Sequence, residues 1–272
     1  MITDAVLFIF LIAFIVGTVA SLLGLAGGTL NVPVLVLIFS YDQITAIGMS
    51  LAIGVVISFT AMVNYAWQQR ILYRTALLLA APAILLSVLS VLVSVSMTNT
   101  MLTVTFIIIL IFIAMTMVKP DLFSLPDIRT GPEYHDGCKD RYGEEYSRDF
   151  HALHMIVWGS GGGMMNGFTG LGGGSINVPA LITAKTPPHY ATATSTMVVF
   201  LASLAASATH AGLGSISSAG FLVFYIAGAT AGVFAGTRYA RRLKSSQLSF
   251  GFGLFLIFVC FLMGINLIFE VI

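Results

Sequence analysis

A ten-residue stretch that occurs twice in the chain holds most of the residues that could bind a ligand. The first copy, residues 24–33, reads GLAGGTLNVP, and the second copy, residues 170–179, reads GLGGGSINVP. The two copies agree at seven of their ten positions. Glycine adds backbone freedom that weakens a helix, and proline cannot continue a helix beyond its first turn without loss. Each copy therefore predicts a helix that breaks at the glycines and restarts at the proline.

Such a break has the chemistry of an anion-binding site. A helix that restarts after the break points its first, unpaired N–H groups at it, together with about half a positive charge. Glycine lets a ligand approach the backbone closely, and threonine, serine and asparagine add short hydrogen-bonding groups. The candidate substrate-binding residues of the two copies are Gly27, Gly28, Thr29, Asn31, Pro33, Gly173, Gly174, Ser175, Asn177 and Pro179. The alternative is that the glycines only permit close helix packing.

Four polar residues outside the duplicated stretch complete the candidate site, namely Ser50, Asn64, Ser195 and His210. All four fall within apolar segments, where an asparagine or a histidine without a partner is costly. A hydroxyl in such a segment often bonds only the backbone of its own helix. Asn64 and His210 lie near segment ends, so they could instead face a water-filled vestibule. A protonatable His210 could also couple proton movement to transport.

The composition of the chain places these motifs in a membrane. The sequence is 58% hydrophobic and 8% charged, whereas soluble proteins carry roughly 25% charged residues. Apolar runs of about twenty residues recur, which is the length that a helix needs to cross a bilayer. No basic cluster is interleaved with aromatic residues, so we expect no nucleic-acid partner. The chain also lacks a nucleophile–base set, a Walker loop and a dinucleotide fingerprint, and we expect no catalytic residue, metal, cofactor or enzyme activity.

The apolar segments divide into two similar halves. In the first half we expect spans at 5–24, 44–67, 75–96 and 101–118, with a short apolar piece at 33–39. In the second half we expect spans at 151–171, 190–211, 218–237 and 248–268, with a short piece at 179–184. The short pieces measure about 10 Å and cannot cross a membrane. The predicted fold is an all-α polytopic membrane protein with two inverted-topology repeats, residues 1–118 and 151–272, each a broken or re-entrant hairpin plus three transmembrane helices.

The segment between the halves, residues 119–150, differs sharply from the rest of the chain. It holds five of the twelve Lys and Arg residues and eight of the eleven Asp and Glu residues, so we expect a water-exposed linker. If each broken hairpin returns to the side from which it entered, all twelve basic residues fall on one face of the membrane. Short cytoplasmic loops are enriched in basic residues. We therefore expect a cytoplasmic linker, with both termini outside the cell (inner) membrane.

The duplicated stretch resembles the signature of the sulfite exporter TauE/SafE family of membrane permeases. The residues that carry the resemblance are 24–33, 167–179 and the two Ala-x-x-x-Ser stretches Ala46–Ser50 and Ala191–Ser195. The resemblance covers both halves, and it implies a transporter of sulfite or of organosulfur and sulfonate anions, usually out of the cell. Ala26 departs from the family's triple glycine in the first copy, so the two half-sites could be unequal.

Together these features predict a membrane transporter that exports a small sulfur-containing anion, sulfite or an organosulfonate. Its site would form at the membrane midplane where the two broken helices meet. An anion channel of the same architecture, and an importer or exporter of another small organic anion, stay open as alternatives. A membrane enzyme or an assembly scaffold ranks last, because the interiors of the spans contain no Asp or Glu. The expected partners are the anion and the lipid bilayer, and the chain could form a homo-oligomer.

Overall fold

Ten helices and one two-stranded sheet make up the part of the chain that the computed structural model describes, residues 2–22, 28–118, 126–141, 143–215, 219–240 and 245–271. The first half contains α1 (Ile2–Leu22), α2 (Gly28–Leu37), α3 (Gln43–Trp67), α4 (Tyr73–Ser96) and α5 (Asn99–Val118). The strands β1 (Glu133–Lys139) and β2 (Glu145–His151) follow. The second half contains α6 (Ala152–Thr169), α7 (Gly174–Thr183), α8 (Pro188–Gly212), α9 (Ala219–Ala240) and α10 (Ser245–Val271).

The helices have the length and the surface of membrane-spanning helices. Helices α3, α4 and α8 and most of α5 are long and apolar enough to cross a bilayer, and α1, α9 and α10 contain shorter apolar segments. Large apolar side chains such as Leu85, Ile108 and Phe261 point away from the protein interior. An apolar surface of this extent suits lipid and would be unfavourable in water. The prediction of a mostly helical, multi-pass membrane protein is therefore confirmed.

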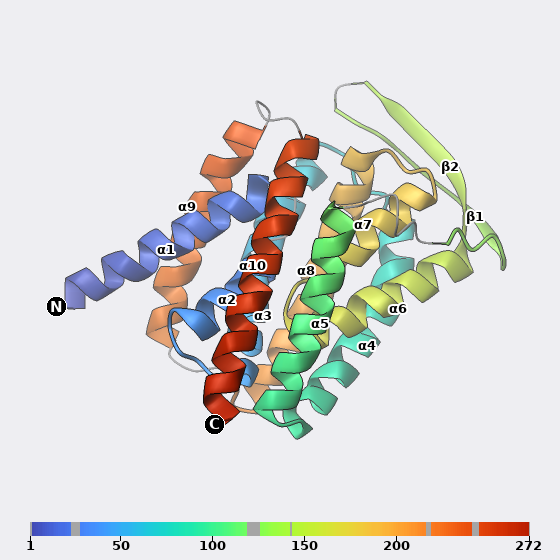
Figure 1. The fold of residues 1–272 in the computed structure, drawn as a ribbon. Coiled ribbons are helices and arrows are strands. Elements are labelled where there is room, and N and C mark those ends of the chain that lie inside the picture. The colour runs from blue at the N-terminus through green and yellow to red at the C-terminus, as the bar shows by residue number, and fades with distance from the viewer. Residues whose placement is uncertain are drawn as a thin grey trace.

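The first helix of each half packs against a helix of the other half. Helix α1 packs along α9, whereas α6, its counterpart in the second half, packs along α4. Helix α3 packs against α8 and α5 against α10, and Figure 1 shows the pairs α1–α9 and α5–α10 side by side. If the two halves are interchanged, the pair α1–α9 becomes the pair α6–α4, and the pairs α3–α8 and α5–α10 are unchanged. The packing follows the duplication in the sequence, while the inverted orientation of the two halves stays a prediction.

Glycines allow these helices to approach each other closely. A Cβ added to Gly159 or Gly163 in α6 would overlap the backbone of α4, and one added to Gly228 or Gly232 in α9 would overlap the backbone of α1. Small residues bring membrane helices into direct backbone contact, where dispersion replaces the hydrophobic effect that lipid cannot supply. These glycines therefore hold each half against the other.

The second copy of the duplicated stretch breaks the chain between α6 and α7, as the sequence predicts. Gly170, Gly172 and Gly173 have φ angles of 66°, 87° and 58°, in the left-handed region that favours glycine. Three left-handed residues within four positions cannot continue an α-helix, so the chain turns here. In the first copy, residues 24–27 lie outside the described part of the chain.

The point at which the helices restart differs from the expectation. Helix α7 begins at Gly174 and α2 begins at Gly28, so the prediction that each helix restarts at its proline is wrong. Pro33 and Pro179 are instead the sixth residue of each helix. A proline at this position removes one intrahelical hydrogen bond, the one that its own N–H would donate to the carbonyl four residues earlier. Most residues before it belong to the first turn, whose N–H groups have no intrahelical acceptor in any case.

The segment that was expected to be a plain water-exposed linker contains an antiparallel β-hairpin. Strand β1 pairs with β2 from Glu133 opposite His151 to Lys139 opposite Glu145. One face of the hairpin carries Tyr134 stacked on Phe150, with ring centroids 5.8 Å apart. Phe150 is buried in a hydrophobic cluster with residues of α4 and α8. The hairpin therefore adds a small sheet, docked on the helices, to the helical fold.

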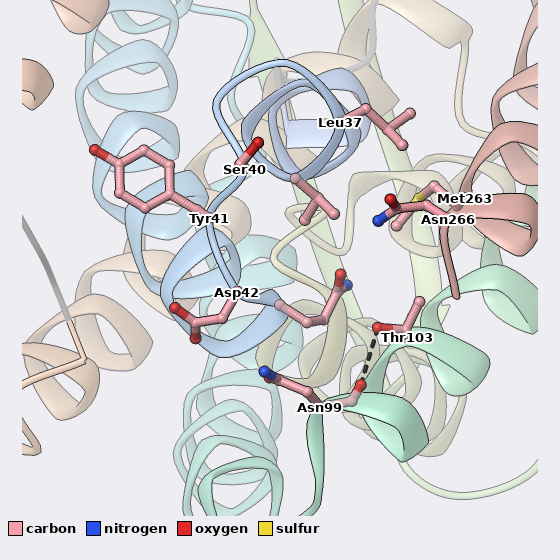
Figure 2. A pocket seen from close by; sticks show the side chains of 10 residues that line it. Leu37, Ser40, Tyr41, Asp42, Asn99, Thr103, Met263 and Asn266 are labelled. Carbon is pink, nitrogen blue, oxygen red and sulfur yellow. Dashed lines mark hydrogen bonds between the residues drawn. The ribbon is translucent and has the colours of Figure 1, made fainter. Parts of the chain in front are cut away.

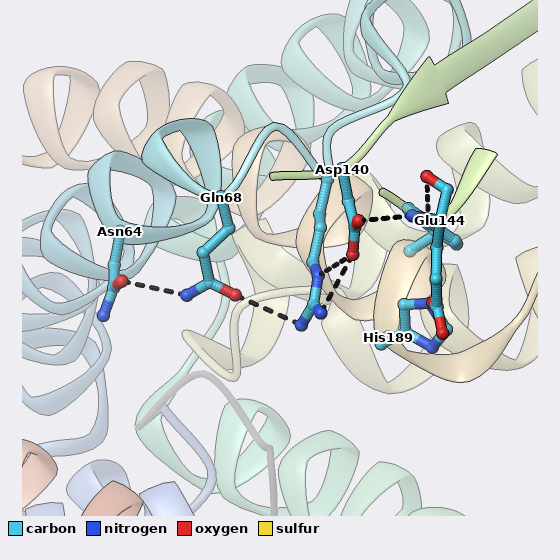
Figure 3. Close-up of polar contacts among 7 residues, drawn as sticks. Asn64, Gln68, Asp140, Glu144 and His189 are labelled. Atoms are coloured by element: carbon cyan, nitrogen blue, oxygen red, sulfur yellow. Dashed lines mark hydrogen bonds and ion pairs between the residues drawn. The ribbon is translucent and has the colours of Figure 1, made fainter. Parts of the chain in front are cut away.

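Two carboxylates fasten the hairpin to the turn between α3 and α4. Asp136 accepts hydrogen bonds from the backbone N–H and the hydroxyl of Thr75, at 2.8 and 2.7 Å. It thereby caps the first turn of α4, whose own N-cap residue provides no side-chain hydrogen bond. Asp140 pairs with the guanidinium of Arg70 at 3.1 Å, and Figure 3 shows Asp140 within a row of polar contacts that runs from Asn64 through Gln68 and continues to Glu144.

The hairpin also contacts the turn between α7 and α8. The Tyr146 hydroxyl donates to the carbonyl of Lys185 at 3.4 Å, and the Tyr146 ring stacks on Tyr190 with centroids 5.3 Å apart. Since Arg70 and Lys185 come from different halves, the hairpin bridges the two halves at one end of the molecule. The basic residues Arg70 and Lys185 and the hairpin thus share one end, as the charge pattern predicts.

Candidate functional site

The break between α6 and α7 is held by contacts from α3. The Ser50 hydroxyl is buried and donates to the carbonyl of Gly170 at 2.9 Å. A Cβ on Gly170 would lie 3.1 Å from the carbonyl oxygen of Ile47, so a larger residue would push the break away from α3. Ser50, one of the predicted site residues, therefore lies at the break and fixes its position.

The start of α7 gathers several further predicted site residues. A Cβ on Gly174 would lie 3.6 Å from the Ser195 hydroxyl, and one on Gly173 would lie 2.5 Å from the carbonyl oxygen of Gly162. Asn177 packs with its side chain directly over Gly162 and is 1% exposed. Among the described residues, its Oδ1 has no hydrogen-bond partner. Gly173, Gly174, Asn177 and Ser195 thus form one cluster around the first turn of α7.

The remaining predicted residues of the second copy lie beside this cluster. The Ser175 hydroxyl donates to the sulfur of Met165 at 3.7 Å. Pro179 lies inside α7 and has no N–H to donate, so the carbonyl of Ser175 lacks the usual partner four residues later. This leaves an additional polar backbone group near the break.

The first copy shows a similar buried asparagine with a different partner. Asn31 is 0% exposed, and its Oδ1 accepts a hydrogen bond of 3.2 Å from the hydroxyl of Tyr225 in α9. Its Nδ2 has no partner among the described residues. Thr29 and Pro33 are buried in the same helix. Gly28 is the first residue of α2, and Gly27 lies outside the described residues.

Tyr225 is the site residue that the sequence analysis missed. It lies in an apolar helix, is fully buried and points its hydroxyl at the other half of the molecule. A buried tyrosine usually needs a partner for its hydroxyl, and this is the signal that could have drawn attention to it. The identity of that partner is not readable from the sequence, because 194 positions separate the two residues.

The two copies border one hydrophobic cluster. Leu30 and Val32 of the first copy and Leu171 of the second copy are buried members of this cluster, and Ile176 packs against it. Apolar residues of both copies therefore belong to one extended core cluster, but α2 and α7 are not among the helix pairs that pack closely together. The polar atoms Asn31 Nδ2 and Asn177 Oδ1 are buried on the two helices that adjoin it.

Asn64 and His210 do not gather at one place. Asn64 is exposed near the hairpin end of α3, where its Oδ1 accepts from Gln68 at 3.0 Å. His210 is fully buried against Gly48, whose added Cβ would lie 3.3 Å from the imidazole ring. Gly48 and Asn64 are sixteen residues apart on α3, which corresponds to ~24 Å along the helix. Among the described residues, neither ring nitrogen of His210 has a hydrogen-bond partner.

The electrostatics of the breaks come from the backbone and from neutral side chains. The twelve Lys and Arg residues of the sequence all lie outside both duplicated stretches. Helix N-termini, carboxamides and hydroxyls are the groups that could stabilise an anion there through partial charges. In α7 the N–H groups of Gly174, Ile176 and Asn177 already donate to the carbonyls of Gly172 and Gly173. In the described part of the chain, no group of three or more His, Cys, Asp or Glu residues is placed to hold a metal ion.

Comparison with known proteins identifies the family of the chain. The model of the sulfite exporter TauE/SafE family matches residues 9–263. The chain is 27% identical to the probable membrane transporter protein YunE of Bacillus subtilis, over 95% of this chain and 96% of that protein. It is 28% identical to the probable membrane transporter protein MJ0441 of Methanocaldococcus jannaschii, over 71% of this chain and 68% of that protein. No solved structure matches the chain. The family resemblance is thereby confirmed, and the chain is a membrane transporter that belongs to the sulfite exporter TauE/SafE family.

Proposed function

We propose that the protein exports a small sulfur-containing anion, sulfite or an organosulfonate, through a site at its two helix breaks. The observation that carries this proposal is the pair of motif asparagines. Asn31 and Asn177 are 0% and 1% exposed, and each keeps one amide atom without a partner among the described residues. An unpaired buried polar atom costs about 1–3 kcal/mol. Asn31 Nδ2 can donate a hydrogen bond to an anion, whereas Asn177 Oδ1 can only accept one, so the second site favours a ligand that also carries a hydrogen-bond donor.

The surrounding groups favour an anion of modest size. Each asparagine is the fourth residue of a short helix that begins at a glycine, so it lies next to the first N–H groups and the positive end of the helix dipole. The absence of basic residues from both motifs leaves partial charges to hold the ligand. Partial charges bind less tightly than a lysine or an arginine does, which suits a carrier that must release its substrate.

The membrane potential supports export as the direction. With the interior negative, moving a monoanion outward gains ~2.3 kcal/mol per 100 mV, so export needs no ATP. The orientation that we propose places the hairpin and its basic neighbours in the cytoplasm and both termini outside the cell membrane. In this orientation the two halves are inverted, and the helices α2 and α7 approach the site from opposite sides of the membrane.

Binding and flux measurements on Asn31→Ala and Asn177→Ala test the proposal. We expect both variants to bind sulfite more weakly in calorimetry and to lose saturable sulfite efflux from liposomes. Thr105→Ala serves as the control, because the Thr105 hydroxyl is exposed and bonds only the Met101 carbonyl of its own helix. Unchanged sulfite binding in both asparagine variants would remove the site assignment. A large, electrically driven and non-saturating current would indicate a channel instead of a carrier.

A further inference from the structure

A cleft of about 400 Å³ lies at the end of the molecule opposite the hairpin. It forms where α2 ends, where α3 and α5 begin, and beside α10. Figure 2 shows Asp42, Asn99, Thr103 and Asn266 arranged around this space. The residues that line it do not include any of the residues proposed above for the anion.

The cleft is lined by polar side-chain atoms that lack partners, most of which are oxygens. Gln43 is 3% exposed, and neither its Oε1 nor its Nε2 has a hydrogen-bond partner among the described residues. The buried Oδ1 of Asn99 is unpaired in the same way. Thr103 donates its hydroxyl hydrogen to the carbonyl of Asn99 at 2.9 Å, so its oxygen can only accept from, or coordinate, another group. Unpaired acceptors in a buried wall indicate that something else completes the site.

The charge of the cleft is negative. Asp42 contributes a carboxylate, and none of the lining residues is a lysine, an arginine or a histidine. The last residues of α2, Val36 and Leu37, also line the cleft, and no described backbone N–H donates to their carbonyl oxygens. The C-terminal end of a helix carries about half a negative charge, and half-helix ends of this kind coordinate cations in transporters.

A side chain caps one N–H group at the start of each of the two adjoining helices. Asp42 accepts from the backbone N–H of Thr45 at 3.1 Å, which caps α3. The hydroxyl of Thr98 accepts from the backbone N–H of Met101 at 3.3 Å, which caps α5. One of the first N–H groups of each helix is therefore already paired, and at α3 the partner is the Asp42 carboxylate, whose negative charge offsets the positive helix end beside the cleft.

We propose that this cleft binds a monovalent cation through oxygen ligands, and that its occupancy strengthens binding of the anion that the proposed function assigns to the helix breaks. A single carboxylate suits a monovalent ion better than Ca²⁺, whose sites use several. The volume admits a metal ion with some of its waters, at about 30 Å³ for each water, or a small ammonium group. The shared chemistry is a compact positive charge surrounded by carboxamide, hydroxyl and carboxylate oxygens.

The cleft is close enough to the break for the two ligands to affect each other. Gln43 at the cleft and Ser50 at the Gly170 break are seven residues apart on α3, which is ~10 Å along the helix. Opposite charges at this distance in a poorly hydrated protein attract each other enough to raise affinity several-fold. By linkage, the anion must raise the cation's affinity by the same factor.

The full chain in detergent provides the test, with Na⁺, K⁺, methylammonium and the bulky N-methylglucamine ion compared at constant ionic strength. We expect a saturable rise of the unfolding temperature with one of the small cations and none with N-methylglucamine. A response to Na⁺ or K⁺ identifies a metal site, and a response confined to methylammonium identifies an ammonium site.

Two variants in the cleft should change the cation Kd in opposite directions. Asp42→Asn retains a good helix cap but loses the charge, so the cation Kd should rise by about tenfold or more. Gln43→Glu adds a carboxylate and should lower the cation Kd. Asp149→Asn, in the exposed part of the hairpin, is the control and should leave the Kd unchanged.

A cleft that holds only water would give no cation-specific shift, and this result would overturn the proposal. An equal shift in the wild type and in Asp42→Asn would overturn it as well. Sulfite titrations in N-methylglucamine buffer separate the two proposals. Sulfite binding that persists there without any response to small cations removes only the cation site, whereas failure to bind sulfite in every buffer removes the proposed function.

Discussion

Replacing Tyr225 by phenylalanine removes one hydrogen bond at the first helix break and leaves the shape of the core intact. The hydroxyl is the donor to Asn31 Oδ1 at 3.2 Å, and both residues are fully buried. The bond holds the carboxamide so that its Nδ2, which is unpaired among the described residues, is available to a ligand. The variant therefore tests whether the orientation of Asn31 matters for anion binding.

The distance sets the size of the expected effect. A separation of 3.2 Å is longer than the usual 2.7–2.8 Å of a hydroxyl–oxygen hydrogen bond, so we expect a net loss of about 1 kcal/mol in the free energy of unfolding. Without the hydroxyl, the carboxamide can turn or shift in the free protein and must be reoriented when the anion binds. The anion's affinity should therefore fall by at most about fivefold, which corresponds to the same ~1 kcal/mol.

A double-mutant cycle isolates this contribution. Sulfite affinity is measured by calorimetry for the wild type, Tyr225→Phe, Asn31→Ala and the double variant. If Tyr225 acts only by orienting Asn31, Tyr225→Phe should have little effect once the asparagine has been replaced. The coupling energy should then be about 1 kcal/mol. Equal losses of affinity from Tyr225→Phe in both backgrounds would refute the reasoning.

Other perturbations test the hairpin, the helix packing and the buried thiol. Arg70→Met removes the ion pair of the buried Asp140 carboxylate; since Arg70 is 22% exposed, we expect a cost of about 3 kcal/mol, at the low end for a buried pair. Faster proteolysis of the hairpin would reveal the loss, and unchanged proteolysis would contradict it. Gly163→Ala would force a Cβ into the α4 backbone and should destabilise the protein by about 1–3 kcal/mol. Gly161→Ala is its control, because that Cβ would meet its nearest neighbour at 3.9 Å; equal melting temperatures for the two variants would refute the packing account. Burial and two neighbouring aspartates raise the pKa of Cys138 to about 11, so in a Cys260→Ala background its alkylation by iodoacetamide should keep accelerating well above pH 9, because the thiolate is the reactive form; a plateau near pH 9 would contradict this.

The hairpin shows why secondary structure in a strongly charged segment is hard to predict from sequence. Its charges are typical of a water-exposed linker, and they alone predict no strand. The alternation of Tyr134, Asp136 and Cys138 along β1 was nevertheless present, and it places those side chains on one face of the strand. Two strands alone are marginally stable. The hairpin depends on Phe150 packing into the helical core and on Asp136 capping α4, and neither partner adjoins it in sequence.

The duplicated stretch shows the complementary case. The break itself was predictable, because glycines that adopt positive φ angles are a local requirement of the backbone. The restart at Gly174 instead of Pro179 was not predicted, because the proline was assigned to the first helical position. Its actual place in the second turn is tolerated at the cost of one hydrogen bond.

The sequence by itself determined that the chain is a mostly helical membrane protein that contains one stretch twice, and that a helix breaks at the second copy of this stretch. These properties follow from the length of apolar runs and from glycine content, which are local. Only the tertiary structure decided that Tyr225 meets Asn31, that the hairpin caps α4, and that unpaired oxygens surround a cleft at the far end of α3. The physical reason is that helices apolar on nearly all sides carry no polar stripe to show which face meets which neighbour. Their pairing is therefore settled by close packing between distant segments.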